Sequence, residues 1–139
     1  MATPGQIIQD CPCGSGHRYT RCCGRYHQGE PAPSAEALMR SRYSAYVLGL
    51  LDYLRHSWHP DTCPGELMLE PGLRWLGLKI HHTEAGGPAD NEGRVTFVAR
   101  HKLHGRAGRL QENSRFVRYQ GRWVYLDGEI RQQPIGLNS

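Results

Sequence analysis

The chain has 139 residues, of which 38% are hydrophobic and 22% are charged, and its formal net charge is +4. This length and composition are those of one globular domain that can bury a core without disulfide support. The longest apolar run, at 46–51, is far shorter than the roughly 20 residues of a membrane-spanning helix. The first ten residues lack the basic and apolar segments of a signal peptide. We therefore expect a cytoplasmic protein with no membrane insertion.

Four of the five cysteines lie within thirteen residues near the N-terminus, in the pattern C-x-C-x8-C-C: Cys11, Cys13, Cys22 and Cys23. A disulfide framework is disfavoured, because no export signal is present and adjacent cysteines pair only with strain. A redox site would show C-x-x-C beside a βαβ pattern. Tetrahedral Zn²⁺ takes four ligands from two short segments, as this cluster offers. The pattern predicts a structural Zn²⁺ site with no open position for catalysis.

The residues between these cysteines favour metal binding as well. Glycines at 14 and 16 permit a tight turn with positive φ, which brings backbone N–H groups near the thiolates. Residues 19–25 are expected to form a short helical turn that presents the last two cysteines. His27 is an alternative fourth ligand in place of Cys23. Four cysteines already complete a tetrahedral site, so a supporting role beside the metal is the favoured interpretation of His27.

Residues 11–24 resemble the SEC-C motif, the short zinc module at the C-terminal end of the SecA translocation ATPase. That motif reads C-x-C-x8-C followed by His or Cys, and the four cysteines fall on its ligand positions. The resemblance implies a structural zinc site that serves as a contact surface for a protein partner. The motif's basic character is kept here by His17, Arg18 and Arg21.

The next segment shows helical signals. Residues 28–33 read as a linker, and Ser34 is a plausible helix N-cap. Apolar residues at helical spacing predict a helix that breaks near Gly49 and a second helix from Leu51 to about His56. Pro60 ends it. A third helical segment, with a loop, is predicted within 63–77.

From residue 78 the apolar period changes to two, which predicts strands. Four strands are expected, at 78–84, 94–104, 108–119 and 121–129, with glycine-containing turns between them. Helices followed by an antiparallel meander indicate an α+β fold, with the sheet curled over its helices.

This order resembles the cone fold of the nuclear transport factor 2-like (NTF2-like) superfamily. The resemblance is sharpest to the uncharacterised bacterial YchJ-like proteins, through segments 38–46, 52–54, 58–60, 95–100, 112–116 and 121–128. It implies a SEC-C-type zinc motif at 1–30, an NTF2-like domain at 31–132 and a tail at 133–139. The resemblance is more informative about fold than about function.

Cones of this type often hold a pocket between the sheet and the helices. Its candidate residues are Arg42, Tyr43, Tyr46, Trp58, His59, Glu112, Ser114, Trp123, Tyr125 and Asp127. An enzyme would use His59 or Glu112 as a general base. No nucleophile pairs with either of them in the sequence, so structural roles are favoured and no catalytic residue is assigned.

Nine Lys or Arg but only three acids lie between 94 and 131. Solvated strand residues explain this excess more simply than a nucleic-acid surface. The leading hypothesis is therefore a zinc-binding protein-interaction module, whose zinc folds the knuckle but not the larger domain. The alternatives are a small-molecule or enzymatic pocket in the cone, and a ribosome- or RNA-associated factor. A homodimer through the open sheet face is a further alternative.

Overall fold

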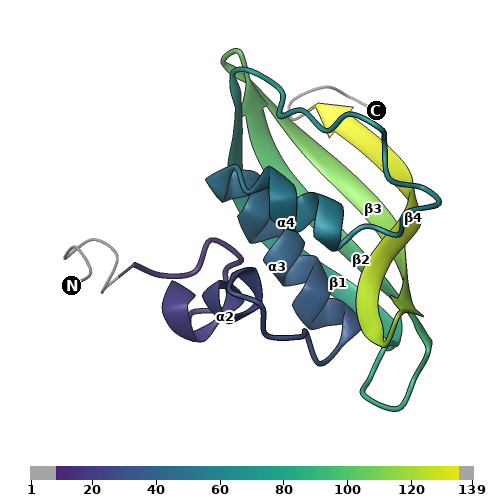
Figure 1. Ribbon diagram of the computed structural model, residues 1–139. Helices are drawn as coiled ribbons and strands as arrows, with labels where there is room; N and C mark the ends of the chain where they lie inside the picture. Colours follow the sequence, from purple (N-terminus) through teal and green to yellow (C-terminus); the bar gives the residue numbers. More distant parts are fainter. Residues whose placement is uncertain (1–8, 135–139) are drawn as a thin grey trace.

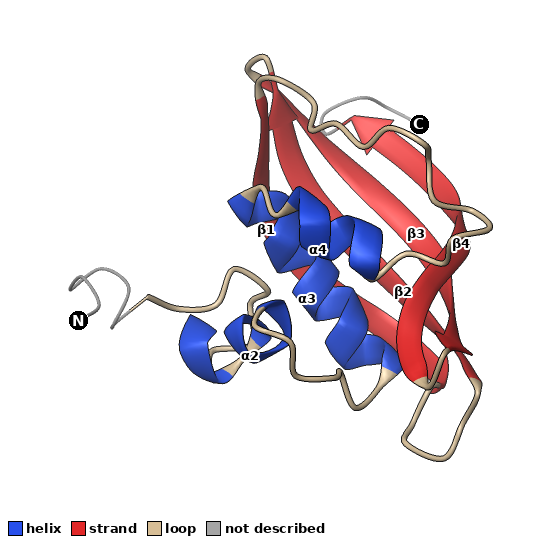
Figure 2. Ribbon diagram, in the orientation of Figure 1, coloured by secondary structure: helices blue, strands red, loops and turns tan. Residues whose placement is uncertain are grey.

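The computed structural model describes residues 9–134. Figures 1 and 2 show a curved antiparallel sheet with helices packed on one face and a small N-terminal module beside them. The strands are β1 (Leu73–Ala85), β2 (Glu92–Leu103), β3 (Arg106–Tyr119) and β4 (Arg122–Pro134). They neighbour one another in chain order. The predicted α+β cone with its N-terminal knuckle is confirmed.

The N-terminal module contains a short 3-10 helix, η1 (Tyr19–Arg21), followed by α2 (Cys23–His27). The predicted helical turn at 19–25 is therefore present. The first eight residues, on which the signal-peptide analysis rests, lie outside the described part of the chain. Between residues 9 and 134 no helix is long and apolar enough to cross a membrane.

The helices of the cone follow the predicted pattern. Helix α3 (Ala35–Leu48) begins at Ser34, whose Oγ accepts a hydrogen bond of 3.1 Å from the backbone N–H of Ala37. It ends at Gly49, which adopts the left-handed conformation with φ of 74°. Helix α4 (Leu51–His56) follows at once. The break at Gly49 thus lets α4 turn back and pack against α3.

The predicted third helical segment is wrong. Residues 63–72 form a loop, and β1 begins at Leu73. Prolines at 64 and 71 interrupt helical hydrogen bonding in the loop, while residues 73–85 pair with β2 along their whole length. Residues 73–77 form a strand because they pair with β2. Local sequence patterns do not indicate which distant strand a segment will pair with.

The core lies between α3 and the inner face of the sheet. Val95, Phe97 and Phe116 from the sheet pack with Leu38 and Met39 from the helix. The strands β3 and β4 shift register between Arg115 and Phe116. The same hydrophobic cluster includes all four cysteines of the N-terminal module. The module is therefore packed into the core of the cone.

Candidate metal centre and cone pocket

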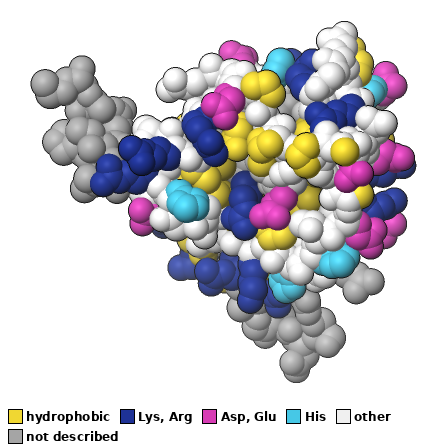
Figure 3. Space-filling model, turned by 90° about the horizontal axis from the view of Figure 1, so that it is seen from below, with side chains coloured by type: hydrophobic (Ala, Val, Ile, Leu, Met, Phe, Trp, Pro, Cys, Tyr) yellow, Lys and Arg dark blue, Asp and Glu magenta, His cyan; other side chains and the backbone are white. Residues whose placement is uncertain are grey.

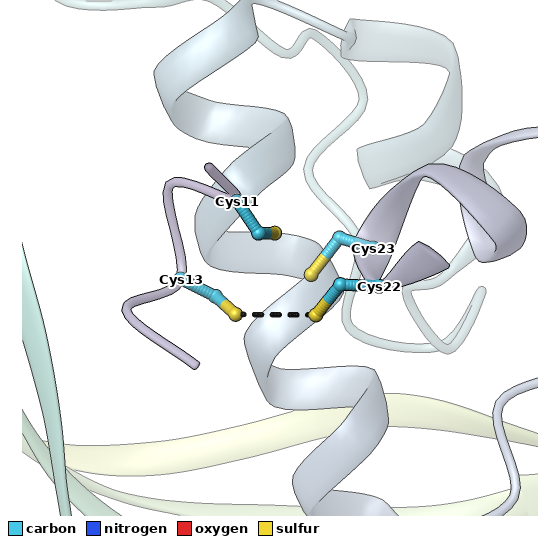
Figure 4. A group of neighbouring side chains, drawn as sticks. All are labelled: Cys11, Cys13, Cys22 and Cys23. Atoms are coloured by element: carbon cyan, nitrogen blue, oxygen red, sulfur yellow. Dashed lines mark hydrogen bonds between the residues drawn. The ribbon is translucent and has the colours of Figure 1, made fainter. Parts of the chain in front are cut away.

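The four cysteines of the N-terminal module converge on one point (Figure 4). Their Sγ atoms all lie within 4.8 Å of one another, and those of Cys13 and Cys22 are 3.6 Å apart. In a tetrahedral site with Zn–S bonds of about 2.3 Å, the sulfurs stand about 3.8 Å apart. All four side chains are buried free thiols. The group has the donor set, spacing and enclosure to hold a metal ion.

Local backbone structure brings these thiols together. The N–H of Cys11 donates to the carbonyl of His17 at 2.9 Å, which closes the first loop. Gly14 and Gly16 in that loop both have positive φ, of 79° and 86°. Cys22 is the junction between η1 and α2. The change of helix type at this residue lets two adjacent side chains reach the same centre.

The thiols depend on one another electrostatically. The pKa of Cys13 lies far below its usual range, because the Cys11 and Cys23 thiols donate hydrogen bonds to its thiolate. Burial raises the pKa of Cys22, and the hydrogen bonds to Cys11 and Cys13 raise that of Cys23. Full ionisation of four neighbouring sulfurs needs a cation among them.

His27, the alternative ligand, lies outside this group. Its Nε2 is 2.8 Å from the carbonyl oxygen of Ser41, and its Nδ1 is 2.6 Å from the hydroxyl of Tyr19. The carbonyl can only accept, so Nε2 carries the proton and Nδ1 accepts from Tyr19. Both ring nitrogens are thus occupied, one in joining α2 to α3 and the other in joining α2 to η1. Burial lowers the pKa of His27, which favours this neutral form.

Helix α3 completes the surroundings of the metal centre. The Oγ of Ser44 lies 3.5 Å from the Sγ of Cys11. The guanidinium of Arg40 donates to the carbonyl of Cys13 at 3.0 Å and lies 3.9 Å from its sulfur. The same guanidinium pairs with Glu36 one turn earlier. Sequence reasoning missed these two α3 residues, since only the docking of the module on α3 brings them to the cysteines.

A separate cavity of about 330 Å³ opens between the helices and the sheet. Seven of the ten predicted pocket residues line it: Arg42, Tyr43, Tyr46, Trp58, Glu112, Ser114 and Tyr125. Trp75 and Phe97 are further walls. Trp75 is not among the predicted pocket residues, because it falls in the wrongly predicted helical segment.

Two buried charged residues face this cavity. Arg42 is 4% exposed, and its Nη1 donates to the Leu54 carbonyl at 3.0 Å and to the Ser57 hydroxyl at 2.8 Å. Glu112 is 7% exposed, and its Oε2 accepts from Ser114 and Tyr125 at 2.5 and 2.8 Å. Burial and the nearby carboxylate raise the pKa of Tyr125, so its hydroxyl remains a donor.

The other three predicted pocket residues lie elsewhere. Asp127 is exposed and forms an ion pair of 2.8 Å with Arg115. Trp123 is buried in the core, and Arg118 lies over its ring. The ring of His59 packs edge-on against that of Tyr119. Alternation along a strand predicts two faces, but the register shift between β3 and β4 changes which residues near 125 point inward.

The basic residues of the sheet have mixed roles. Arg115, Arg118 and Arg122 are engaged by an acid or by backbone carbonyls. Arg94, Arg100, Lys102, Arg106 and Arg109 are exposed, as expected for solvated strand residues. His101, by contrast, is buried against Trp75. It lies on the inner face of β2 with Phe97 and Ala99.

The sequence matches two known family models, one for each part of this structure. Residues 34–128 match the family model described as the middle NTF2-like domain of YchJ, and residues 9–25 match the SEC-C motif. The chain belongs to the YchJ-like family. Proteins named UPF0225 from Chromobacterium violaceum and Methylibium petroleiphilum are 53% and 57% identical to it. The first alignment covers 94% of this chain and 99% of that relative, and the second covers 91% and 92%.

Two solved structures of SEC-C motif containing proteins share this fold. A SEC-C motif containing protein from Rhodopseudomonas palustris, determined in solution, superposes with a TM-score of 0.72 at 32% identity. That match covers 86% of this chain and 96% of the other. A crystal structure of a SEC-C motif containing protein from Psychrobacter arcticus gives 0.67 at 27% identity, over 88% and 82%. The knuckle and cone thus occur together in solved relatives.

Proposed function

We propose that this YchJ-like protein binds zinc through its four N-terminal cysteines and uses the resulting knuckle to dock an acidic protein surface. The observation that carries the proposal is the convergence of four buried sulfurs within 4.8 Å. Thiolates select Zn²⁺ among the common divalent ions, and four of them close the site. The metal then stabilises a surface and carries out no chemistry itself.

The outer side of the knuckle supplies that surface. Arg18, Arg21 and Arg25, which we call the basic rim, are all exposed. Figure 3, the view from below, shows several Lys and Arg side chains in dark blue on this face of the molecule. The one ion pair of the rim among described residues, Arg25 with Glu30, is 3.8 Å long and exposed. Such an exposed ion pair contributes little free energy. The positive charge of the basic rim is therefore available to an acidic surface of a partner.

Metal identity is tested by elemental analysis of protein purified without chelator. About one zinc per chain is expected, the number that one four-ligand site holds, and Cys22→Ser should abolish it. Cys63→Ser is the matched control, because Cys63 lies outside the sulfur group. Iron or no metal in the wild-type protein would contradict the proposal.

Partner docking is tested by affinity capture after nuclease treatment. We compare wild type with the rim reversal R18E/R21E/R25E and with a control reversal, R74E/K102E/R106E, of three exposed arginine or lysine residues on the sheet. Partners lost only with the rim reversal, at unchanged zinc content, support docking through the knuckle. Capture that disappears on nuclease treatment would instead identify RNA as the partner.

A further inference from the structure

Six of the thirteen residues that line the cavity between the helices and the sheet are aromatic. Tyr43 and Tyr46 come from α3, Trp58 follows α4, and Trp75 and Tyr125 come from the two outer strands of the sheet. Its volume of about 330 Å³ is at the lower end of the range for small-molecule sites, which runs from about 300 to 1,000 Å³. The cavity therefore suits a compact ligand with an apolar body.

The two buried charges at this cavity are not paired with each other. Among the side chains that the structure describes, which end at residue 130, the ion pairs include neither Arg42 nor Glu112. Isolated charges are costly to bury, and that cost is recovered only through hydrogen bonds or an opposite charge. A folded chain with two such groups at one cavity is complementary to a ligand that brings both opposite charges.

Each charged group also retains hydrogen-bonding capacity. The side-chain hydrogen bonds of Arg42 within the described chain all come from Nη1, whereas a guanidinium has five N–H donors. Its Cζ lies 4.7 Å from the centroids of both the Trp58 and the Tyr125 ring, and these two rings meet edge to face. Hydrogen bonds from the described residues to Glu112 end on Oε2. The second carboxylate oxygen is therefore available to a ligand donor.

From this arrangement we infer that the cavity binds a small zwitterion of the α-amino-acid class. The ligand carboxylate accepts hydrogen bonds from Arg42, the ammonium group donates to Glu112, and the apolar body lies against the aromatic walls. Charge-assisted hydrogen bonds of this kind are the strong ones, and aromatic rings also attract an ammonium group. This ligand is independent of the partner proposed for the knuckle.

The test uses two sets of compounds, in each of which one analogue lacks the ammonium group of the amino acid and the other lacks its carboxylate. Phenylalanine is compared with 3-phenylpropionate and phenethylamine, and leucine with 4-methylpentanoate and 3-methylbutylamine, by titration calorimetry on the zinc-loaded full chain. An analogue that lacks one charge leaves either Arg42 or Glu112 without its charge-assisted hydrogen bond. At least one zwitterion should therefore bind about tenfold or more tightly than both of its analogues. Absence of binding at millimolar concentrations, or equal binding of a zwitterion and its carboxylate analogue, would overturn the inference.

The variant Glu112→Gln provides the second measurement. The amide oxygen still accepts from Ser114 and Tyr125, so the pocket should remain folded. Loss of the negative charge should reverse the ranking, with the carboxylate analogue binding at least as tightly as the amino acid. Asp127→Asn removes an exposed carboxylate outside the cavity and should leave the wild-type ranking intact. An unchanged ranking in Glu112→Gln would also overturn the assignment.

Discussion

The hydroxyl of Ser44 lies 3.5 Å from the sulfur of Cys11, although 33 positions separate the two residues in the sequence. This contact joins the first cysteine of the knuckle to the central helix of the cone. The same helix carries Arg42, Tyr43 and Tyr46 of the cavity. The metal centre and the cavity are thus supported by one helix, which leads us to expect that loss of metal affects the stability of both.

Replacing one metal ligand should destabilise the whole protein without unfolding the sheet. In Cys22→Ser the metal is lost, and polar groups remain among side chains that pack on Leu38 and Met39. Unsatisfied buried groups cost roughly 1–3 kcal/mol, so the thermal midpoint should fall while the strand signal in circular dichroism persists. An unchanged midpoint would show that the knuckle folds independently of the cone, as the sequence analysis predicted.

Arg40 should strengthen metal retention, because its guanidinium donates a hydrogen bond to the backbone carbonyl of Cys13 and so fixes the loop that carries this ligand. Removing such a supporting contact typically lowers metal affinity about 10- to 100-fold. We expect Arg40→Met to lose zinc faster to a chromogenic chelator. Arg55→Met is the matched control, since Arg55 lies 3.9 Å from the sulfur of Cys63, outside the sulfur group. Equal release rates in the two variants would contradict a role for Arg40.

His27 should make stability depend on pH. Burial lowers its pKa below the ordinary value of 6.5, so the unfolded state binds more protons as the pH falls below 6.5. The stabilisation is therefore complete above pH 6.5 and is lost as the pH falls towards the lowered pKa. Urea unfolding between pH 8 and 5.5 should show a smaller pH dependence in His27→Gln than in wild type.

Two features of this pH experiment need separate measurements. Burial also lowers the pKa of His56, so a residual dependence of the same sign should remain in His27→Gln. Zinc content is measured at each pH, because protonation of thiolates releases metal. An identical pH dependence in wild type and variant, at equal zinc content, would refute the role assigned to His27.

Gly93 of β2 lies close to the first residue of α3, so we expect that no side chain is tolerated at this position. A Cβ placed there would lie 2.5 Å from the Cα of Gly86 and 3.1 Å from the Cβ of Ala35. Gly93→Ala should therefore cost roughly 1–3 kcal/mol, the usual range for overpacking, measured by urea unfolding. Gly65→Ala is the control, because a Cβ at Gly65 meets no atom within 4 Å. An unchanged free energy of unfolding in Gly93→Ala would contradict this prediction, because it would mean that the β1–β2 hairpin and α3 move apart at little cost.

Much of this protein was predictable from local sequence patterns. The cysteine spacing identified the four residues whose sulfurs converge, because metal ligands must come from short, closely spaced segments. Ser34 and Gly49 marked the ends of α3 through their cap chemistry. Period-two alternation located the first residue of three of the four strands to within two positions. In each case the physical cause acts between residues near one another in the chain.

Tertiary structure decided the rest. Strand β1 began five residues earlier than predicted, because pairing with β2 overrides local propensity. The pocket gained Trp75 and lost Asp127 through strand register, which depends on a partner strand. Arg40 and Ser44 reached the cysteines only because the knuckle docks on α3. Sequence by itself determined the ligand set and the order of elements, whereas contacts between distant segments, which no local pattern encodes, determined how the metal centre and the charged cavity are built around one helix.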